Sequence, residues 1–401
     1  MNTPKIRFKG FKDDWEQRKV GEFLTESRES GHKGDIAHKM TVKLWGKGVY
    51  EKKETGSANT QYFTRHAGQF IYSKLDFLNC AFGVVPEELE NLETTADVPA
   101  FDCDGVNPYF MFYTAIQPRF YEKNGMIADG SRKAKRIHAD TFLDMPFFVP
   151  SLKEQNKIVN LLSELDNLIT LHQRKCDETK QLKKFMLQKM FPKNGEKNPE
   201  IRFEGFTDDW EQRKVLDLLV QPVTDGPHET PRLVENGIPF ISVDAIVDNK
   251  IDFSRKRGDV SEEYDAECCK KYKPQYHDVY VVKSGSTVGK VAIVETTDRF
   301  NIWSPLAALR CEGKTKPYYL FYLLQTRRMQ AQILDKASNG TQPNLSMREL
   351  EKFDVLVTDN AEEQQRIGDY FKSLDHLITL HQRKCEKLKA LKKFMLQNMF
   401  I

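Results

Sequence analysis

The stretch TLHQRKC occurs at residues 170–176 and again at residues 379–385. So long a mixture of polar and apolar residues does not recur by chance in a chain of this length, so the sequence indicates a duplicated unit. Around this stretch, segments 164–191 and 373–400 are identical at three positions in every four, at an offset of 209. Segments 6–20 and 201–215 are identical at all but two positions, at an offset of 195. The sequence therefore predicts two copies of one unit, with an insertion in the second copy before residue 277.

The middles of the two units are less similar in sequence than their ends. NPYFMFY at 107–113 matches KPYYLFY at 316–322 in its apolar pattern, but most other identities between the two middles are lost. Near-identical ends predict two identical tasks, such as binding one kind of partner twice. Divergent middles on one scaffold predict two different recognition tasks.

Apolar residues recur at helical spacing through residues 153–191, which contain no proline or glycine, and through the second copy of this stretch, which is interrupted only by Gly368. This pattern predicts a long helix in each of the segments 151–192 and 359–401. Helices of this length need a partner, and we expect an antiparallel coiled coil whose central polar layer fixes the register. The alternative is that each helix packs only on its own domain. The expected facing pairs are Leu162 with Leu391, Leu165 with Leu388, His172 with His381, and Leu182 with Phe371.

Each middle mixes strand-like and helix-like runs. The predicted strands include 69–73, 80–85, 277–283 and 289–295, and the helix-like runs are 109–122 and 318–334. The expected fold class is therefore α+β, with two globular domains and an internal pseudo-twofold repeat. The expected domains are 1–150 and 206–358, with a linker at 193–205.

Two motifs resemble enzyme sites but lack residues that those sites require. KSGSTVGK at 283–290 is one residue short of a phosphate-binding loop, and Val291 stands where a hydroxyl should bind magnesium. As a hairpin tip it is suited to contact a sugar-phosphate backbone or base edges, although a turn without a ligand has the same composition. NPYF at 107–110 lacks the second proline of the adenine methyltransferase loop and predicts a helix start with a buried aromatic face. The sequence indicates no catalytic or metal-ligating arrangement.

Composition limits the possible partners and compartment. The net charge is only +3 although 30% of residues are charged, so a polyanion must be held by local patches such as 132–136, 255–257 and 270–273. Any one of these clusters is by itself more typical of a solvated surface. Seven scattered cysteines without a CxxC pair suggest neither a disulfide framework nor a zinc site. With no export signal and no long apolar run, we expect a cytoplasmic protein.

The order of these features resembles the specificity subunit of type I restriction-modification enzymes. WEQRKV opens each unit, and DGPHETP at 225–231, GIPFISV at 237–243, KSGSTVGKVAIV at 283–294 and SNGTQPNLS at 338–346 follow in the second unit. The resemblance covers essentially the whole chain. The first middle departs from it, with YSKLDFLNCAFGVV at 72–85 and DGSRKAKRIH at 129–138 in the corresponding places.

The resemblance implies a subunit without chemistry of its own, which reads a bipartite, asymmetric sequence in double-stranded DNA, one half-site per domain. Its partners would be two methyltransferase subunits, which use S-adenosylmethionine, and two restriction subunits, which use ATP and magnesium. The implied DNA contacts in the second domain are His228, Thr230, Lys283, Ser284, Ser286, Thr287, Lys290, Gln342 and Asn344. Their counterparts or nearest basic groups in the first domain are Lys74, Arg132, Lys133, Lys135 and Arg136.

Two other functions fit parts of the sequence. The chain could be a DNA adenine methyltransferase with degenerate motifs, which predicts specific crosslinking of S-adenosylmethionine to the isolated chain. It could also be a duplicated coiled-coil adaptor, which predicts no affinity for duplex DNA.

Overall fold

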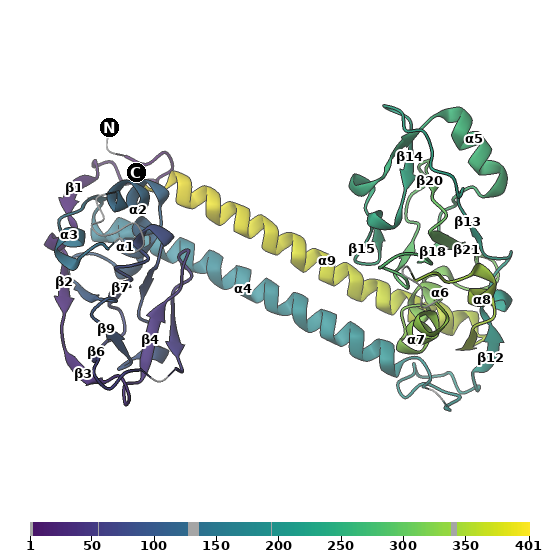
Figure 1. Ribbon diagram of the computed structural model, residues 1–401, viewed down its shortest axis with the longest axis horizontal. Coiled ribbons are helices and arrows are strands. Elements are labelled where there is room, and N and C mark those ends of the chain that lie inside the picture. Colours follow the sequence, from purple (N-terminus) through teal and green to yellow (C-terminus); the bar gives the residue numbers. More distant parts are fainter. Residues whose placement is uncertain (1–2, 55, 127–135, 194, 338–342) are drawn as a thin grey trace. The chain divides into compact units, whose positions relative to one another are not determined.

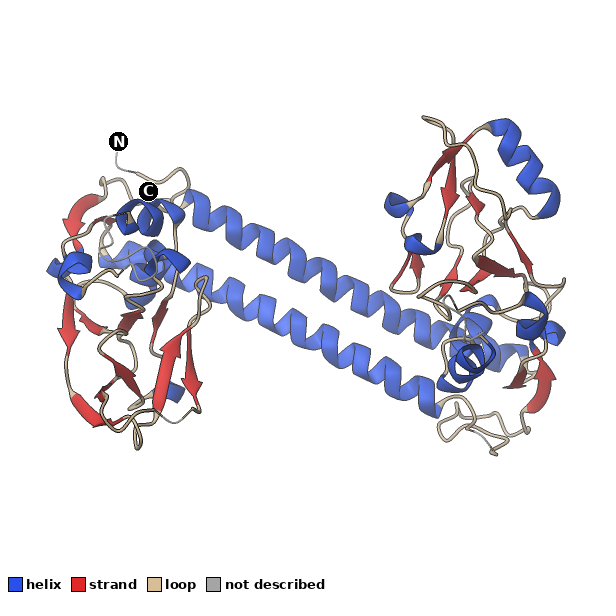
Figure 2. Ribbon diagram, in the orientation of Figure 1, coloured by secondary structure: helices blue, strands red, loops and turns tan. Residues whose placement is uncertain are grey.

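The computed structural model describes residues 3–54, 56–126, 136–193, 195–337 and 343–401 (Figures 1 and 2). The chain forms two compact units: unit 1 comprises Met1–His172 with Arg383–Ile401, and unit 2 comprises Gln173–Gln382. Each unit combines small β-sheets with helices, which confirms the predicted α+β class.

Unit 1 contains three sheets within its described residues. The first pairs β1 (Glu16–Lys19) with β11 (Pro146–Val149) in antiparallel fashion. The second has the order β2-β10-β7-β8, with bounds Leu24–Ser27, Ala100–Cys103, Phe70–Tyr72 and Phe82–Val84. The third has the order β3-β6-β9-β4-β5, with bounds Ser30–Lys33, Gln61–Thr64, Glu93–Thr95, Lys39–Val42 and Val49–Lys52.

Unit 2 repeats the first two of these sheets and differs in the rest. The pair β12 (Glu211–Lys214) and β22 (Asp354–Val357) corresponds to β1 and β11. The next sheet has the order β13-β21-β18-β19, with bounds Thr224–Asp225, Leu306–Leu309, Val279–Val282 and Val291–Ile293. A sheet β17-β14-β20 (Gly258–Val260, Ile238–Ile241, Asn301–Ile302) and a hairpin of β15 (Ile246–Val247) and β16 (Lys250–Ile251) complete the unit. The predicted strands are confirmed as β7, β8, β18 and β19.

Each predicted helix-like run is two short helices instead of one. Unit 1 has α1 (Pro108–Ala115) and α2 (Pro118–Gly125), and unit 2 has α6 (Pro317–Leu323) and α7 (Arg327–Lys336). Pro118 disfavours helical geometry in the residue before it, and Gln117 is accordingly extended. Thr326 is also extended, and its side chain caps α7 by accepting a hydrogen bond from the backbone N–H of Met329. The remaining short helices are α3 (Ala139–Leu143), α5 (Glu262–Lys271) and α8 (Met347–Glu351).

Two long helices, α4 (Leu152–Lys189) and α9 (Ala361–Asn398), contribute to both units. Unit 1 takes α4 up to His172 and α9 from Arg383, and unit 2 takes the remainder of each helix. Within each unit the two helices run in opposite directions, as the teal α4 and the yellow α9 show in Figure 1. This arrangement confirms the predicted antiparallel pairing.

The same ion pair joins α4 to α9 in each unit. In unit 1 the Lys392 ammonium lies 2.6 Å from both carboxylate oxygens of Asp166, and the Tyr113 hydroxyl lies 3.2 Å from the same carboxylate. In unit 2 the counterparts are Lys183, at 2.7 and 2.9 Å from Asp375, and a tyrosine of α6 at 2.8 Å. One residue of each pair therefore comes from the first repeat and one from the second.

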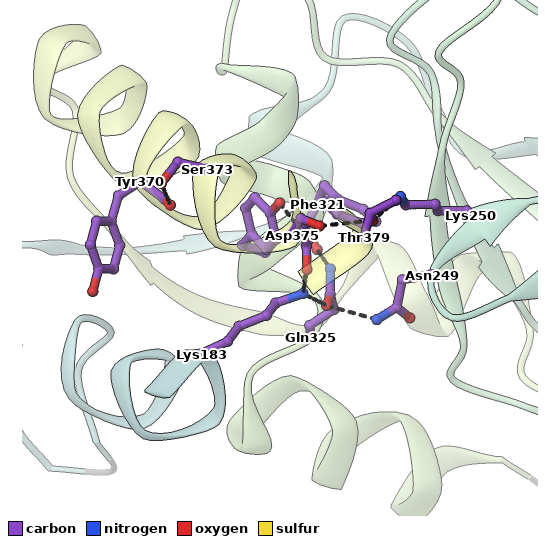
Figure 3. A network of polar contacts seen from close by, with 10 residues as sticks. Lys183, Asn249, Lys250, Phe321, Gln325, Tyr370, Ser373, Asp375 and Thr379 are labelled. Atoms are coloured by element: carbon purple, nitrogen blue, oxygen red, sulfur yellow. Dashed lines mark hydrogen bonds and ion pairs between the residues drawn. The ribbon is translucent and has the colours of Figure 1, made fainter. Parts of the chain in front are cut away.

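A further contact of unit 2 joins the β15–β16 hairpin to α9 (Figure 3). The Asn249 amide donates to Gln325, at 3.0 Å, and the Gln325 oxygen also lies 3.5 Å from the Lys183 ammonium. The Lys250 ammonium donates to the Thr379 hydroxyl, at 2.9 Å. The hairpin of unit 2 is thus held by side-chain hydrogen bonds to Gln325, between α6 and α7, and to α9.

The aromatic residue that follows each long helix completes the core of the unit in which that helix ends. Phe400 packs in unit 1, with its ring centroid 5.5 Å from that of Phe110 and 6.4 Å from that of Trp15. Its counterpart Phe191 packs in unit 2, 6.0 Å from Trp210. Phe191 belongs to the first repeat by sequence but to the second unit by packing. The division of the sequence into 1–150 and 206–358 therefore omits part of each core.

The helix seam differs from its prediction at two leucines. Leu162, Leu165 and Phe371 are buried and Leu388 is half-buried. Leu182 and Leu391, however, keep 44% and 40% of their surface exposed. Because the next residue, Lys183 or Lys392, turns towards the partner helix to form the ion pair, the leucine lies about 100° away on the outer side. The contact of His172 with His381 stays a prediction.

Candidate nucleic-acid interface

The loop between β18 and β19 joins a second segment of unit 2 through backbone hydrogen bonds. The Gly285 N–H donates to the Pro343 carbonyl at 3.0 Å, and the Leu345 N–H donates to the Lys283 carbonyl at 2.7 Å. Ser284 and Asn344 form an antiparallel bridge between these two bonds. The structure therefore brings together two of the sequence-predicted contact segments, which lie far apart in the sequence. Gln342 lies outside the described residues.

The buried carboxylate of Asp225 organises this region. Its side chain is fully buried, and the Lys283 ammonium lies 3.2 Å from one of its oxygens. The Lys271 ammonium contacts the other oxygen, and the His228 imidazole lies 3.3 Å from the first. Two cationic side chains and a histidine thus surround one buried negative charge. Removing this charge would leave the largely buried Lys283 ammonium without a counter-ion.

The loop after Asp225 is fixed against β20 and the residues that follow it. A Cβ atom at Gly226 would overlap the carbonyl oxygen of Ile302, so this close approach requires glycine. The Ser304 N–H donates to the Pro227 carbonyl at 3.1 Å. These contacts position the exposed His228 side chain beside the β18–β19 loop.

The predicted contact residues of unit 2 differ in accessibility. His228, Thr230, Ser286, Lys290 and Asn344 are exposed, and Ser284 is half-buried. Lys283 is buried by its pairing with Asp225, with only 8% of its surface exposed. The Thr287 hydroxyl is also buried, with no hydrogen-bond partner in the described part of the chain. The five exposed residues can reach a ligand directly, whereas Lys283, paired with Asp225, holds the loop in place.

Unit 1 repeats the backbone pattern with different side chains. The Lys74 carbonyl accepts from the Ile137 N–H at 3.0 Å, as the Lys283 carbonyl accepts from Leu345 in unit 2. Both Lys74 and Arg136 lie next to Asp97, because the Lys74 N–H donates to its carbonyl and the Arg136 guanidinium lies 3.6 Å from its carboxylate. The other predicted basic groups, Arg132, Lys133 and Lys135, lie outside the described residues.

Two residues beside this interface belong to the predicted basic patches but not to the expected set of DNA contacts. Lys271 belongs to the basic cluster 270–273, and it is the partner of Asp225. Arg257 belongs to the cluster 255–257, and its guanidinium lies 4.1 Å from the ring centroid of Trp303. The indole N–H of Trp303 donates to the Glu229 carbonyl of the His228 loop, at 3.2 Å. The clusters themselves were the only sequence signal for these residues.

The long helices carry a second repeated surface, of exposed apolar residues. Each unit exposes two leucines from the middle of one long helix, together with a leucine and a phenylalanine nearer the end of the other. In unit 1 these are Leu168, Leu171, Leu391 and Phe394, and in unit 2 they are Leu377, Leu380, Leu182 and Phe185. The two sets correspond at an offset of 209, so the same four exposed apolar side chains occur once in each unit.

Comparisons with known proteins find similar sequences and similar folds. Residues 207–390 match the type I restriction modification DNA specificity domain. A putative type I restriction enzyme MjaX specificity subunit of Methanocaldococcus jannaschii is 29% identical over 200 residues, which cover 48% of this chain and 46% of that protein. The type I restriction enzyme MjaVIII specificity subunit of the same organism is 26% identical over 268 residues, or 62% and 59% of the two chains. The matches thus span about half the length of these curated relatives.

Solved structures share the fold along almost the entire chain. The type I restriction-modification S subunit from M. genitalium superimposes with a TM-score of 0.62 at 14% identity, covering 100% of this chain and 99% of that one. A chain from a study of complex assembly and conformational transition of the type I R-M system gives 0.51 at 18% identity, covering 96% and 97%. Residues 207–390 thus match the type I DNA specificity domain, and the fold along almost the whole chain is that of solved type I S subunits.

None of the described helices combines the length and the apolar character needed to cross a membrane.

Proposed function

We propose that this protein reads a bipartite, asymmetric DNA sequence for a type I restriction-modification complex, with one half-site contacted by each unit. The chain supplies sequence recognition. Methyltransferase subunits supply S-adenosylmethionine-dependent methylation of adenine, and restriction subunits supply ATP-dependent and magnesium-dependent cleavage.

One observation carries this proposal: equivalent loops stand on an equivalent framework but carry different side chains. The β7–β8 loop of unit 1 and the β18–β19 loop of unit 2 are both tied by a lysine carbonyl to a second segment. Around that shared backbone, unit 2 presents Ser286, Lys290 and Asn344, whereas unit 1 presents Lys74 and Arg136. Two different half-sites require different side chains on a constant backbone. Side chains read the base edges, whereas contacts to phosphates only position the protein on the duplex.

The exposed side chains suit the two kinds of DNA contact. Amides such as that of Asn344 pair with adenine edges, and Ser284, Ser286 and Thr230 can donate to or accept from base edges. Lys290 and Lys74 are suited to phosphate. Lys283 is proposed to hold the loop in place through its ion pair with Asp225. Thr287 and His228 remain proposed contacts of unit 2, and the segment 132–136 remains a proposed contact of unit 1.

Two methyltransferase subunits are the proposed occupants of the repeated apolar surface on the long helices. An identical surface in each unit is suited to two copies of one partner, since each copy meets the same side chains. Covering exposed apolar residues of this kind with a partner helix removes them from water, which favours binding. The restriction subunits are proposed to join the resulting complex.

The DNA proposal is tested by mapping methylated adenines across the host genome with this gene intact and deleted. We expect one asymmetric, split motif to lose its methylation on deletion, and the map then supplies both half-sites. An unchanged map, with the methyltransferase subunit shown to be expressed, would reject the proposal.

The partner proposal is tested with a matched pair of variants, Phe185→Asp and Phe394→Asp. Each places a charge in one of the two equivalent surfaces, so each variant is expected to bind one methyltransferase subunit in place of two, as counted by native mass spectrometry. Lys180→Asp is the control, because this exposed residue lies on a different side of α4. Retention of two subunits by both phenylalanine variants would place the partner elsewhere.

The roles of the two lysines in unit 2 are separated by salt dependence. Lys290→Ala is expected to lower the slope of log affinity against log salt by about one, as loss of one phosphate contact does. If Lys283 acts by holding the loop, Asp225→Asn should weaken target binding about as much as Lys283→Ala does. Weak binding by Lys283→Ala alone, with a slope lowered by one, would instead make Lys283 a direct phosphate contact.

A further inference from the structure

An exposed tryptophan stands at the tip of the hairpin formed by β4 and β5 in unit 1. Trp45 is 61% exposed, whereas Trp15 and Trp210 are buried in the two cores. Its backbone φ is 62°, in the left-handed region that bulky residues rarely adopt. Conformational strain of this kind persists only where surrounding structure fixes it, and it is concentrated at functional sites.

Backbone hydrogen bonds hold the tip in place while the indole remains outside. The Lys43 N–H donates to the Gly48 carbonyl at 2.8 Å and closes the turn. The Trp45 N–H donates to the Asn79 carbonyl at 2.9 Å, and the Gly46 N–H donates to the Cys80 carbonyl at 2.8 Å. The side chain is therefore presented from an anchored backbone, which lowers the entropy cost of using it for binding.

The anchor is the loop that corresponds to the proposed DNA-contact loop of unit 2. Asn79 and Cys80 lie between β7 and β8, and residues 74–81 correspond to 283–290 at an offset of 209. Lys74 begins this loop, and Leu78, which precedes Asn79, is also exposed. Trp45 thus lies beside the proposed DNA interface of unit 1, although it belongs to a different segment of the sequence.

The charge around the indole matches a nucleic acid. Lys43 and Lys47 flank Trp45, and the segment from 43 to 50 (KLWGKGVY) contains no acidic residue. The Lys43 ammonium lies 5.2 Å from the ring centroid of Tyr50, which itself is exposed. An aromatic plane between two cations can pack against sugars or unstacked bases while the cations contact neighbouring phosphates. A purely apolar protein partner would gain nothing from the two lysines.

The hairpin at the same place in unit 2 is used differently. β16 packs against β19 as β5 packs against β8, so the two hairpins occupy equivalent positions. The tip of the unit 2 hairpin contains Asp248 and Asn249. The Asn249 amide donates to Gln325 of the same unit (Figure 3). An aromatic group at this position therefore belongs to unit 1 alone.

We infer that Trp45 is a DNA-contacting residue of unit 1, whose indole packs against the nucleotides of the first half-site with Lys43 and Lys47 on adjacent phosphates. The inference rests on the proposed function and extends it to a hairpin outside the predicted contact set. It concerns only the half-site that unit 1 contacts.

The test uses the complex of the full chain with its methyltransferase subunits and a duplex that carries the methylated motif found by genome mapping. We expect Trp45→Ala to weaken binding of this duplex about tenfold to a hundredfold, as loss of one aromatic stacking contact does. Trp45→Phe should recover most of the loss, and Lys47→Ala should lower the salt slope by about one. Ile36→Ala is the control, because Ile36 is a similarly exposed apolar residue of the same unit.

Quenching of tryptophan fluorescence by acrylamide gives a second readout that does not depend on affinity. The duplex should lower quenching in the unaltered complex. The part of this protection that is due to Trp45 should be absent in Trp45→Phe, whereas any protection of the half-buried Trp303 of unit 2 should remain. Unchanged affinity for Trp45→Ala together with an indole still open to acrylamide would overturn the inference, and so would loss of a methyltransferase subunit by Trp45→Ala with DNA binding intact. Absence of any target preference in the unaltered complex would instead reject the proposed function itself.

Discussion

Phe191 and Phe400 provide a matched test of which residues form each unit. Both phenylalanines are buried and follow a long helix, and they hold equivalent positions in the two repeats. Truncating a buried phenylalanine to alanine costs about 3–5 kcal/mol, through lost burial and the cavity that remains. Because each side chain lies in a single core, the cost should fall on one unit only.

The assay is hydrogen exchange of the full chain, followed peptide by peptide with mass spectrometry. At about 1.4 kcal/mol for each factor of ten, the loss corresponds to faster exchange by a factor of at least about 100 in the affected unit. Phe400→Ala is expected to speed hydrogen exchange in peptides that cover Glu16–Lys19 and Pro108–Ala115 of unit 1. Phe191→Ala is expected to speed exchange in Glu211–Lys214 of unit 2 and to leave the two unit 1 peptides protected.

The opposite outcome would refute this reasoning. By sequence, Phe191 belongs to the first repeat, so a chain whose repeats fold separately would show faster exchange in Glu16–Lys19 when Phe191 is truncated. Phe185→Ala is the control for the chemistry of the substitution, since this residue is 49% exposed and fills no core. It should change exchange in neither unit by more than a few-fold.

Three further outcomes follow from local geometry. Gly226→Ala should abolish target binding and lower the melting temperature, because the added methyl group overlaps a carbonyl oxygen at the end of β20; normal binding would show that this loop can move. Lys183→Ala should destabilise unit 2 by about 1–2 kcal/mol in urea unfolding, since it leaves a partly buried carboxylate of α9 unpaired, and no change would show that the pair is solvent-screened. Hydrogen bonds to Glu29 and Glu90 raise the pKa of His66 above its usual value of about 6.5, so their stabilisation is complete below that pH and is lost as pH rises through the raised pKa. The melting temperature of the unaltered protein should therefore exceed that of His66→Gln at pH 6 and approach it at pH 9, and a pH-independent difference would contradict the assignment.

The sequence predicts the periodic elements well because periodicity is a local property. Apolar spacing was sufficient for α4 and α9, although α9 contains Gly368, and short apolar runs were sufficient for β7, β8, β18 and β19. The break between α1 and α2 was also present in the sequence, at Pro118. It was missed because the surrounding apolar residues continue across it.

Accessibility within the candidate interface was beyond the reach of local patterns. Lys283 and Lys290 look alike in the sequence KSGSTVGK, yet one is buried against Asp225 and the other is exposed. The carboxylate that makes this difference lies much earlier in the chain, on β13. The exposure of Trp45 depends in the same way on hydrogen bonds to a distant loop.

The sequence by itself determined that the chain is a duplicated α+β protein with two long antiparallel helices, and the order of its motifs resembles that of type I restriction-modification specificity subunits. Only the tertiary structure decided which residues share a core: the end of each long helix completes the unit of the other repeat, as Phe191 and Phe400 do. Repeats and periodicity are recorded in residue order, whereas burial and charge pairing depend on which distant segments meet. Lys183 and Asp375 come from opposite halves of the chain and form an ion pair only in the folded protein. Neither segment alone contains a pattern that predicts this contact.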